Sequence, residues 1–65
     1  MVTFANWLTK NNISNQAMAD RLKVSRAYVS MLRRHKSKPS IELIKRMVVE
    51  SEGQLTTAGL INEFY

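Results

Sequence analysis

The sequence predicts an all-α protein, a small bundle of four to five helices that forms a single domain over residues 1–65. Apolar residues recur three and four positions apart along most of the chain, which is the spacing of one helical face. There are two glycines and one proline, and none of the three lies in the first 38 residues. A chain this short buries only about 60% of its unfolded surface, so we expect a dense core or self-association to support the fold.

Two short helices are expected in the first third of the chain. Thr3 and Ser14 are suitable N-caps for them, because a hydroxyl oxygen accepts a hydrogen bond from the first turn. Asn11 and Asn12 mark the break between the two helices. The expected inner faces are Phe4, Trp7 and Leu8 in the first helix, and Met18, Ala19 and Leu22 in the second.

A third helix is expected from Arg26 to about Arg34, after a break at Lys23-Val24-Ser25 in which Ser25 is the N-cap. Val29 and Leu32 are three positions apart and are predicted to point inward. The side chains expected to point outward are Arg26, Ala27, Ser30 and Arg33 or Arg34.

A fourth helix is expected after a loop over residues 35–39, where Pro39 imposes extended geometry on Lys38. Ser40 is its predicted N-cap, and Gly53 is read as its end. Its predicted core face consists of Ile41, Ile44 and Val48, with Leu43 and Met47 beside them.

The last segment, residues 54–65, is apolar, and no Lys or Arg follows Met47. Thr56 or Thr57 is expected to open a short turn of helix through Ala58, Leu60, Ile61 and Phe64. Such a segment either folds back over the first and fourth helices or forms a two-fold interface with a second copy. The candidates for a dimer contact are Leu55, Phe64 and Tyr65.

The positive charge is concentrated in one part of the chain. The formal net charge is +5, from ten Lys and Arg against five Asp and Glu. Seven of the ten cations lie between Arg21 and Lys38, and that stretch contains no acidic residue. This polarity suits a polyanion on one side of the molecule, whereas the plainer interpretation is a solvated basic face.

The second and third predicted helices have the features of a steeply crossing pair. Ala19 is small enough for close approach, and only three residues separate the helices. The residues that fill the angle between them are Leu22, Val24, Val29 and Leu32. The third helix is thereby presented with its polar side free, as entry into the major groove of DNA requires.

These residues, with the basic loop at 36–39 and the amphipathic helix at 40–49, resemble the Cro and phage-repressor helix-turn-helix family. The resemblance covers roughly Phe4 to Val49 and implies binding of operator DNA as a dimer. It places the base-contacting positions at Arg26, Ala27, Ser30 and Met31. The family usually has Gln where this chain has Asn15, with Gln16 next, and Gly where it has Lys23. In the family that position usually has a left-handed backbone, which costs a non-glycine residue about 1–2 kcal/mol. Two alternatives follow for Lys23: it adopts this conformation and reaches a phosphate, or the turn differs slightly.

Each base-contact candidate has an alternative role. Arg26 can bind guanine with two hydrogen bonds or contact only phosphate. Ser30 can bind a base or a phosphate. Ala27 and Met31 can each contact a thymine methyl, and the alternative for Met31 is to pack inward. Tyr28 either packs on the first helix or binds phosphate. The full set of DNA-backbone candidates is Asn15, Gln16, Lys23, Ser25, Tyr28, Arg33, Arg34, Lys36, Ser37 and Lys38.

The composition argues against an enzyme, because there is no cysteine, only one histidine, His35, and no suitably paired carboxylates. We expect no catalytic residue, metal site, cofactor or small-molecule ligand. No apolar run approaches the ~18 residues of a membrane span, and the N-terminus does not resemble a signal peptide. We therefore expect a soluble cytoplasmic protein of a bacterial cell or phage-infected host.

The leading hypothesis is a transcriptional repressor that binds duplex DNA sequence-specifically, as a weak homodimer strengthened by DNA. One alternative is a protein-interaction module, antitoxin-like or anti-repressor-like, that uses the same bundle and its apolar tail. Another is an RNA-binding helical protein, although the exposed face offers no aromatic residue beyond Tyr28 for base stacking.

Overall fold

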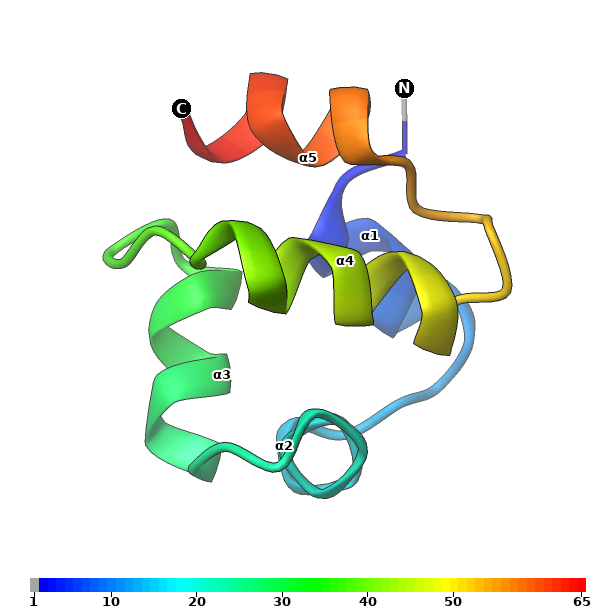
Figure 1. Ribbon diagram of the computed structural model, residues 1–65. Helices are drawn as coiled ribbons and strands as arrows, with labels where there is room; N and C mark the ends of the chain where they lie inside the picture. Colours follow the sequence, from blue (N-terminus) through cyan, green and yellow to red (C-terminus); the bar gives the residue numbers. More distant parts are fainter. Residues whose placement is uncertain (1) are drawn as a thin grey trace.

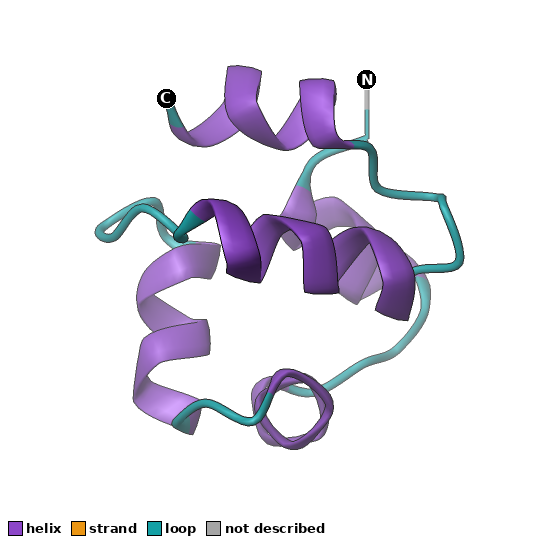
Figure 2. Cartoon of the chain, in the orientation of Figure 1, coloured by secondary structure: helices purple, strands orange, loops and turns teal. Residues whose placement is uncertain are grey.

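The computed structural model describes residues 2–65, which form five helices and no strand. The helices are α1 (Phe4–Lys10), α2 (Asn15–Leu22), α3 (Arg26–Arg33), α4 (Ile41–Glu50) and α5 (Thr57–Phe64). Figure 1 shows α4 at the centre, with α5 above it, α2 below it and α3 at its left. The loop between α3 and α4 projects from the left side of the molecule (Figure 2). The predicted all-α bundle is confirmed.

Every helix begins after a serine or threonine that acts as its N-cap. In each case the side-chain oxygen accepts a hydrogen bond from the backbone N–H three residues later, which satisfies a donor that the helix leaves open. The five caps are Thr3, Ser14, Ser25, Ser40 and Thr56. All five had been predicted, with Thr56 rather than Thr57 at the start of α5.

Four of the helices are followed by a non-glycine residue in the left-handed region. The residues and their φ angles are Asn12 at 54°, Lys23 at 59°, His35 at 58° and Glu52 at 54°. Of the two alternatives for the turn at Lys23, the left-handed conformation is the one observed. The prediction that Gly53 ends the fourth helix was wrong: α4 ends at Glu50, and the N–H groups of Glu52 and Gly53 close it by donating to Val49 and Val48.

The core is drawn from all five helices and from the segment before α5. Its apolar members are Phe4, Trp7, Leu8, Met18, Ala19, Leu22, Val29, Leu32, Leu43, Ile44, Met47, Leu55, Leu60 and Phe64. Ile41 was wrongly placed on the core face: it is 50% exposed, and Val48 is half-buried. The face of α4 that turns inward carries Leu43, Ile44 and Met47, so Ile41, at the first turn, points to solvent.

The C-terminal segment folds back over α1 and α4. The Trp7 indole N–H donates to Gln54 Oε1 at 2.9 Å, and the Phe4 and Phe64 rings pack edge-on with centroids 6.3 Å apart. Leu55 and Phe64, expected as dimer contacts, are buried in their own chain at 1% and 7% exposure, so they have almost no surface to offer a partner. Tyr65, the third candidate, is 60% exposed.

Candidate nucleic-acid interface

The helix pair α2–α3 presents one side of α3 to solvent. Ala19 is fully buried where the helices pack, and Val29 and Leu32 fix the inner side of α3 in the core. Figure 1 shows α2 end-on beside the lower end of α3, which runs down the left side of the view, so the two helices cross steeply. The opposite side of α3 is therefore open to solvent over most of the helix, and Arg26, Ala27 and Met31 are exposed.

The four base-contact candidates lie on this free side. Arg26, Ala27 and Met31 are exposed, and Ser30 is half-buried. Three of them line an open hollow whose fourth member, Asn15, comes from the start of α2; the other lining residues are Arg26, Ala27 and Ser30. The structure thus brings residues from the beginning of both helices to one place.

Arg33, expected to contact the DNA backbone, binds protein side chains in the structure. Its side chain is half-buried, and its Nη1 donates to Asn15 Oδ1 at 2.9 Å while Nη2 donates to Thr9 Oγ1 at 2.7 Å. The guanidinium thereby joins α1, α2 and α3. Sequence reasoning missed Thr9 altogether, because nothing local connects a threonine in α1 with the end of α3.

The loop after α3 carries exposed cations and is held from two sides. Lys36 and Lys38 are exposed and Ser37 is half-buried. The Tyr28 hydroxyl donates to the Lys38 carbonyl at 3.3 Å, and the Tyr65 hydroxyl donates to the Pro39 carbonyl. The Lys38 ammonium also lies 5.3 Å from the centre of the Tyr65 ring. Tyr28 packs on the core and holds the loop, which favours its structural role.

The remaining backbone candidates lie around the same side of the helix pair. Ser25 is occupied as the N-cap of α3, accepting from the Tyr28 N–H at 3.1 Å. Gln16 and Lys23 are exposed, and Gln16 Nε2 donates to Asp20 at 2.9 Å. Arg34 is exposed and follows α3 directly.

A family model described as helix-turn-helix matches residues 5–49 of this chain. The match spans α1 to α4 and includes the whole α2–α3 pair. The chain belongs to the Cro and phage-repressor type of helix-turn-helix family. No curated protein and no solved structure matches it. The family consists of DNA-binding transcription regulators, and membership in it supports DNA binding by this chain.

Within this helix-turn-helix domain, the far end of α3 is joined to α5. His35 Nε2 lies 2.6 Å from Glu63 Oε2, and the His35 ring packs edge-on against Phe64 with centroids 5.2 Å apart. Glu63 Oε1 also accepts the N–H of Phe4 at 2.9 Å, at the first turn of α1. The single histidine therefore ties the loop after α3 to α5, and Glu63 extends this contact to α1.

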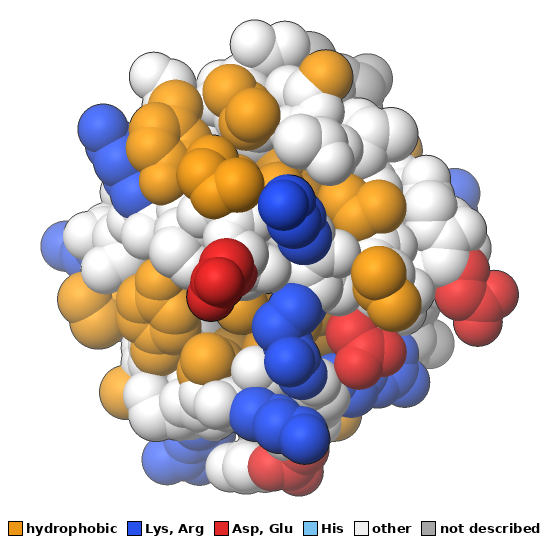
Figure 3. Space-filling view, in the orientation of Figure 1, with side chains coloured by type: hydrophobic (Ala, Val, Ile, Leu, Met, Phe, Trp, Pro, Cys, Tyr) orange, Lys and Arg blue, Asp and Glu red, His pale blue; other side chains and the backbone are white. Residues whose placement is uncertain are grey.

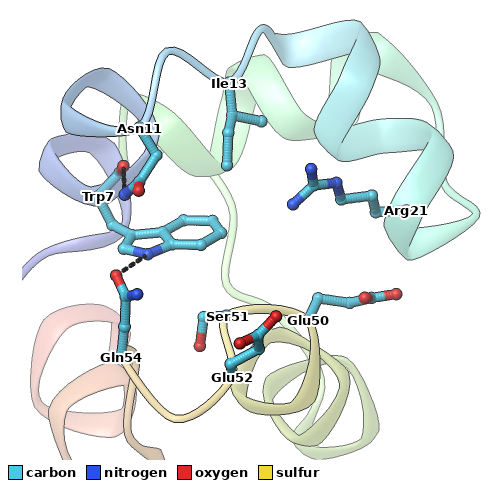
Figure 4. Close-up of a pocket in the computed structure, with 8 residues that line it drawn as sticks. All are labelled: Trp7, Asn11, Ile13, Arg21, Glu50, Ser51, Glu52 and Gln54. Carbon is cyan, nitrogen blue, oxygen red and sulfur yellow. Dashed lines mark hydrogen bonds between the residues drawn. The ribbon is translucent and has the colours of Figure 1, made fainter.

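A second hollow of the helix-turn-helix domain lies between α1, α2 and the end of α4. Figure 4 shows Arg21 on one side of it and Glu50 and Glu52 on the other, with Trp7 and Gln54 joined by their hydrogen bond. Its mixed charge does not favour a polyanion, unlike the cationic surface at α3. Among residues 2–65 no three acidic or histidine side chains gather as metal ligands, and no helix is long and apolar enough to cross a membrane.

Proposed function

We propose that the protein is a transcriptional repressor that reads a specific duplex sequence with α3 and occupies its operator as a two-fold dimer. The observation that carries this proposal is the free side of α3. Arg26, Ala27, Ser30 and Met31 lie there, next to the exposed cations of the following loop. Arg26 reads guanine in the major groove, and Ser30 and the apolar pair contact neighbouring base edges.

The sequence-independent part of binding comes from residues around that helix. Lys36 and Lys38 of the loop, Arg34 and Lys23 supply positive charge to phosphates, while Asn15, Gln16, Ser25 and Ser37 supply neutral donors. A protein bound to a promoter through these contacts excludes polymerase from it, so occupancy of the operator is the repressive activity that we propose.

The dimer is proposed to use an apolar surface formed by Ile41, Ile61 and Tyr65. Ile61 and Tyr65 lie one turn apart at the end of α5, and Tyr65 is bonded to Pro39, two residues before Ile41. All three side chains are exposed, at 50%, 38% and 60%. Figure 3 shows hydrophobic side chains gathered over this end of α4 and α5. In the proposed dimer, two copies of α3 read two half-sites about one helical turn apart.

The decisive experiment is selection of bound duplexes from a random DNA pool, followed by titration of the selected duplex at several salt concentrations. We expect a two-fold symmetric consensus and an affinity that falls steeply with salt, as neutralisation of several phosphates requires. A flat salt dependence, or preference for a folded RNA competitor, would contradict the proposal. Recovery of single half-sites would retain DNA binding and reject the dimer.

A further inference from the structure

The Arg33–Asn15 hydrogen bond has a consequence for DNA binding that follows from the chemistry of the two groups. A guanidinium can only donate, so the Asn15 atom that faces Arg33 is the carbonyl oxygen, at 2.9 Å from Nη1. The carboxamide is planar, and its oxygen and nitrogen diverge from the same carbon, so holding the oxygen against Arg33 leaves the NH₂ group to point in another direction. Asn15 is thereby fixed with its NH₂ group directed away from Arg33.

The position of Asn15 explains why this orientation matters. Asn15 lines the same open hollow as Arg26, Ala27 and Ser30, three of the residues proposed to contact bases. Phosphate oxygens only accept hydrogen bonds, so a nearby asparagine contributes to binding only when its NH₂ group, and not its oxygen, faces the DNA. An asparagine free to rotate would present both ends.

Arg33 itself is held in place by a second contact. Its Nη2 donates to Thr9 Oγ1 at 2.7 Å, so the guanidinium is fixed between α1 and α2. The side chain is half-buried, whereas the next residue, Arg34, is exposed. The two neighbouring arginines therefore have different environments: the Arg33 guanidinium binds side chains of α1 and α2, whereas Arg34 Nε donates to the Ser30 carbonyl of its own helix at 3.4 Å.

We propose that Arg33 is a positioning residue that does not touch DNA and instead holds Asn15 as a one-directional donor to a phosphate. The proposal rests on the DNA-binding function argued above and changes the role that the sequence suggested for Arg33. The neighbouring Arg34 remains a direct phosphate contact, which makes it the natural control.

The first test compares Arg33→Met with Arg34→Met, alone and combined with Asn15→Ala. Arg33→Met and Asn15→Ala should each weaken binding roughly tenfold, as loss of a hydrogen bond to a charged group does. The affinity of the double variant, Arg33→Met with Asn15→Ala, should lie within about twofold of the affinity of either single variant. Arg33→Met should leave the slope of log affinity against log salt unchanged, whereas Arg34→Met should lower it by about 0.9. A slope change of that size in Arg33→Met, with additive losses, would show that Arg33 contacts phosphate directly.

The second test is Asn15→Asp, which keeps an acceptor for Arg33 but puts a carboxylate oxygen where the NH₂ group was. The variant should keep its thermal stability and lose at least tenfold in DNA affinity, whereas Asn62→Asp on α5 makes the same charge change and should lose little. Equal affinities for the two variants would overturn the proposal.

A readout without DNA separates failure of this inference from failure of the proposed function. The side-chain NH₂ signals of Asn15 in an NMR spectrum of the free protein should shift in Arg33→Met but not in Arg34→Met. Unshifted signals would show that Arg33 does not orient Asn15, whether or not the wild-type protein binds duplex DNA. Shifted signals in a wild-type protein that binds no duplex would instead reject the DNA-binding function and the phosphate role of Asn15.

Discussion

At the scale of single residues, Arg26 and Lys36 are both exposed cations on the DNA-binding side but are expected to act differently. Arg26 stands at the first turn of α3, and Lys36 lies in the loop beyond its end. We expect Arg26→Ala to cost about 1–3 kcal/mol on the selected duplex and to relax preference at one base position. Binding of the variant to duplexes substituted one position at a time measures both effects.

Lys36→Ala is the matched control for this prediction. It should weaken all duplexes about equally and lower the salt slope by about 0.9, because it removes a charge and no base contact. If Arg26→Ala lowers specific and non-specific binding by the same factor, Arg26 contacts only the backbone.

Lys23 and Glu52 permit a paired test of backbone strain. Both adopt a left-handed conformation after a helix, at φ angles of 59° and 54°, and both side chains are exposed. Lys23→Gly and Glu52→Gly should each raise the free energy of unfolding by about 1 kcal/mol, because glycine adopts this conformation without steric cost. Urea denaturation measures the gain, and a destabilised Lys23→Gly protein would contradict it.

The same pair also tests whether Lys23 reaches DNA. Lys23 lies in the turn between α2 and α3, whereas Glu52 follows α4. DNA affinity should therefore fall in Lys23→Gly and stay unchanged in Glu52→Gly. Equal affinities would limit Lys23 to a role in the turn.

Sequence reasoning succeeded at the residue scale where the determining interaction was local. The caps from Thr3 to Ser40 and the left-handed Lys23 depend on residues within one turn of each other. The Arg33–Asn15–Thr9 contact was missed because its members are separated by up to 24 positions and meet only after three helices have packed. A cation at the end of α3 is a natural candidate for a phosphate contact, and the sequence alone gives no reason to treat Arg33 differently. Only the packed structure shows that its guanidinium binds other side chains instead.

At the scale of elements, α3 is fixed at both ends by different means. Ser25 caps its beginning, and His35 joins its end to Glu63 of α5. Helical periodicity identified the inner face of α3 correctly because Val29 and Leu32 lie one turn apart and are buried together, whereas the apolar Met31 lies on another side and stays exposed. It failed for Ile41, since α4 has apolar residues on several sides and the neighbouring helices decide which of them are covered.

The Glu63 carboxylate is expected to be the most important polar group of α5. Its side chain is 5% exposed, and it accepts from the Phe4 N–H while contacting His35. Glu63→Ala leaves the buried N–H without its acceptor and should lower the free energy of unfolding by about 1–3 kcal/mol. Chemical denaturation measures the loss, with the exposed neighbour Asn62→Ala as the control, expected within about 0.5 kcal/mol of wild type. Equal stabilities of the two variants would show that Glu63 does not support the bundle.

At the scale of the whole molecule, the C-terminal segment belongs to the bundle. Leu55, Leu60 and Phe64 are core residues, and Gln54 and Glu63 add polar contacts to α1. Composition correctly indicated that the segment was too apolar to be a free end. It did not reveal which apolar residues the single chain buries, because that depends on the direction in which α5 crosses the rest of the molecule. Truncation after Asn62 is therefore expected to unfold the protein rather than to separate two dimer halves.

The proposed dimer is better tested by changing side chains that the single chain leaves exposed. Ile41 and Ile61 are 50% and 38% exposed and flank the end of α5, so a charge at either position meets solvent in the monomer. In a two-fold interface the new carboxylate is buried close to the same carboxylate of the second copy. With no positive charge to pair with, both carboxylates destabilise the dimer. Ile41→Glu and Ile61→Glu should therefore keep the thermal stability and single half-site binding of the wild type while losing cooperative binding to a full operator.

Val2→Glu provides the matched control, because Val2 is an equally exposed apolar residue, at 52%, outside the proposed surface. It should behave as wild type on both half-site and full-operator duplexes. The affinity of each variant is measured for a duplex with two half-sites and for a duplex with a single half-site. The ratio of the two affinities measures cooperativity independently of changes in the contacts to DNA. Loss of cooperativity in the Ile variants alone would locate the interface at this end of α4 and α5. If all three variants bind the full operator as tightly as wild type, the dimer uses another surface, and exposed Val49 on α4 is the next position to change.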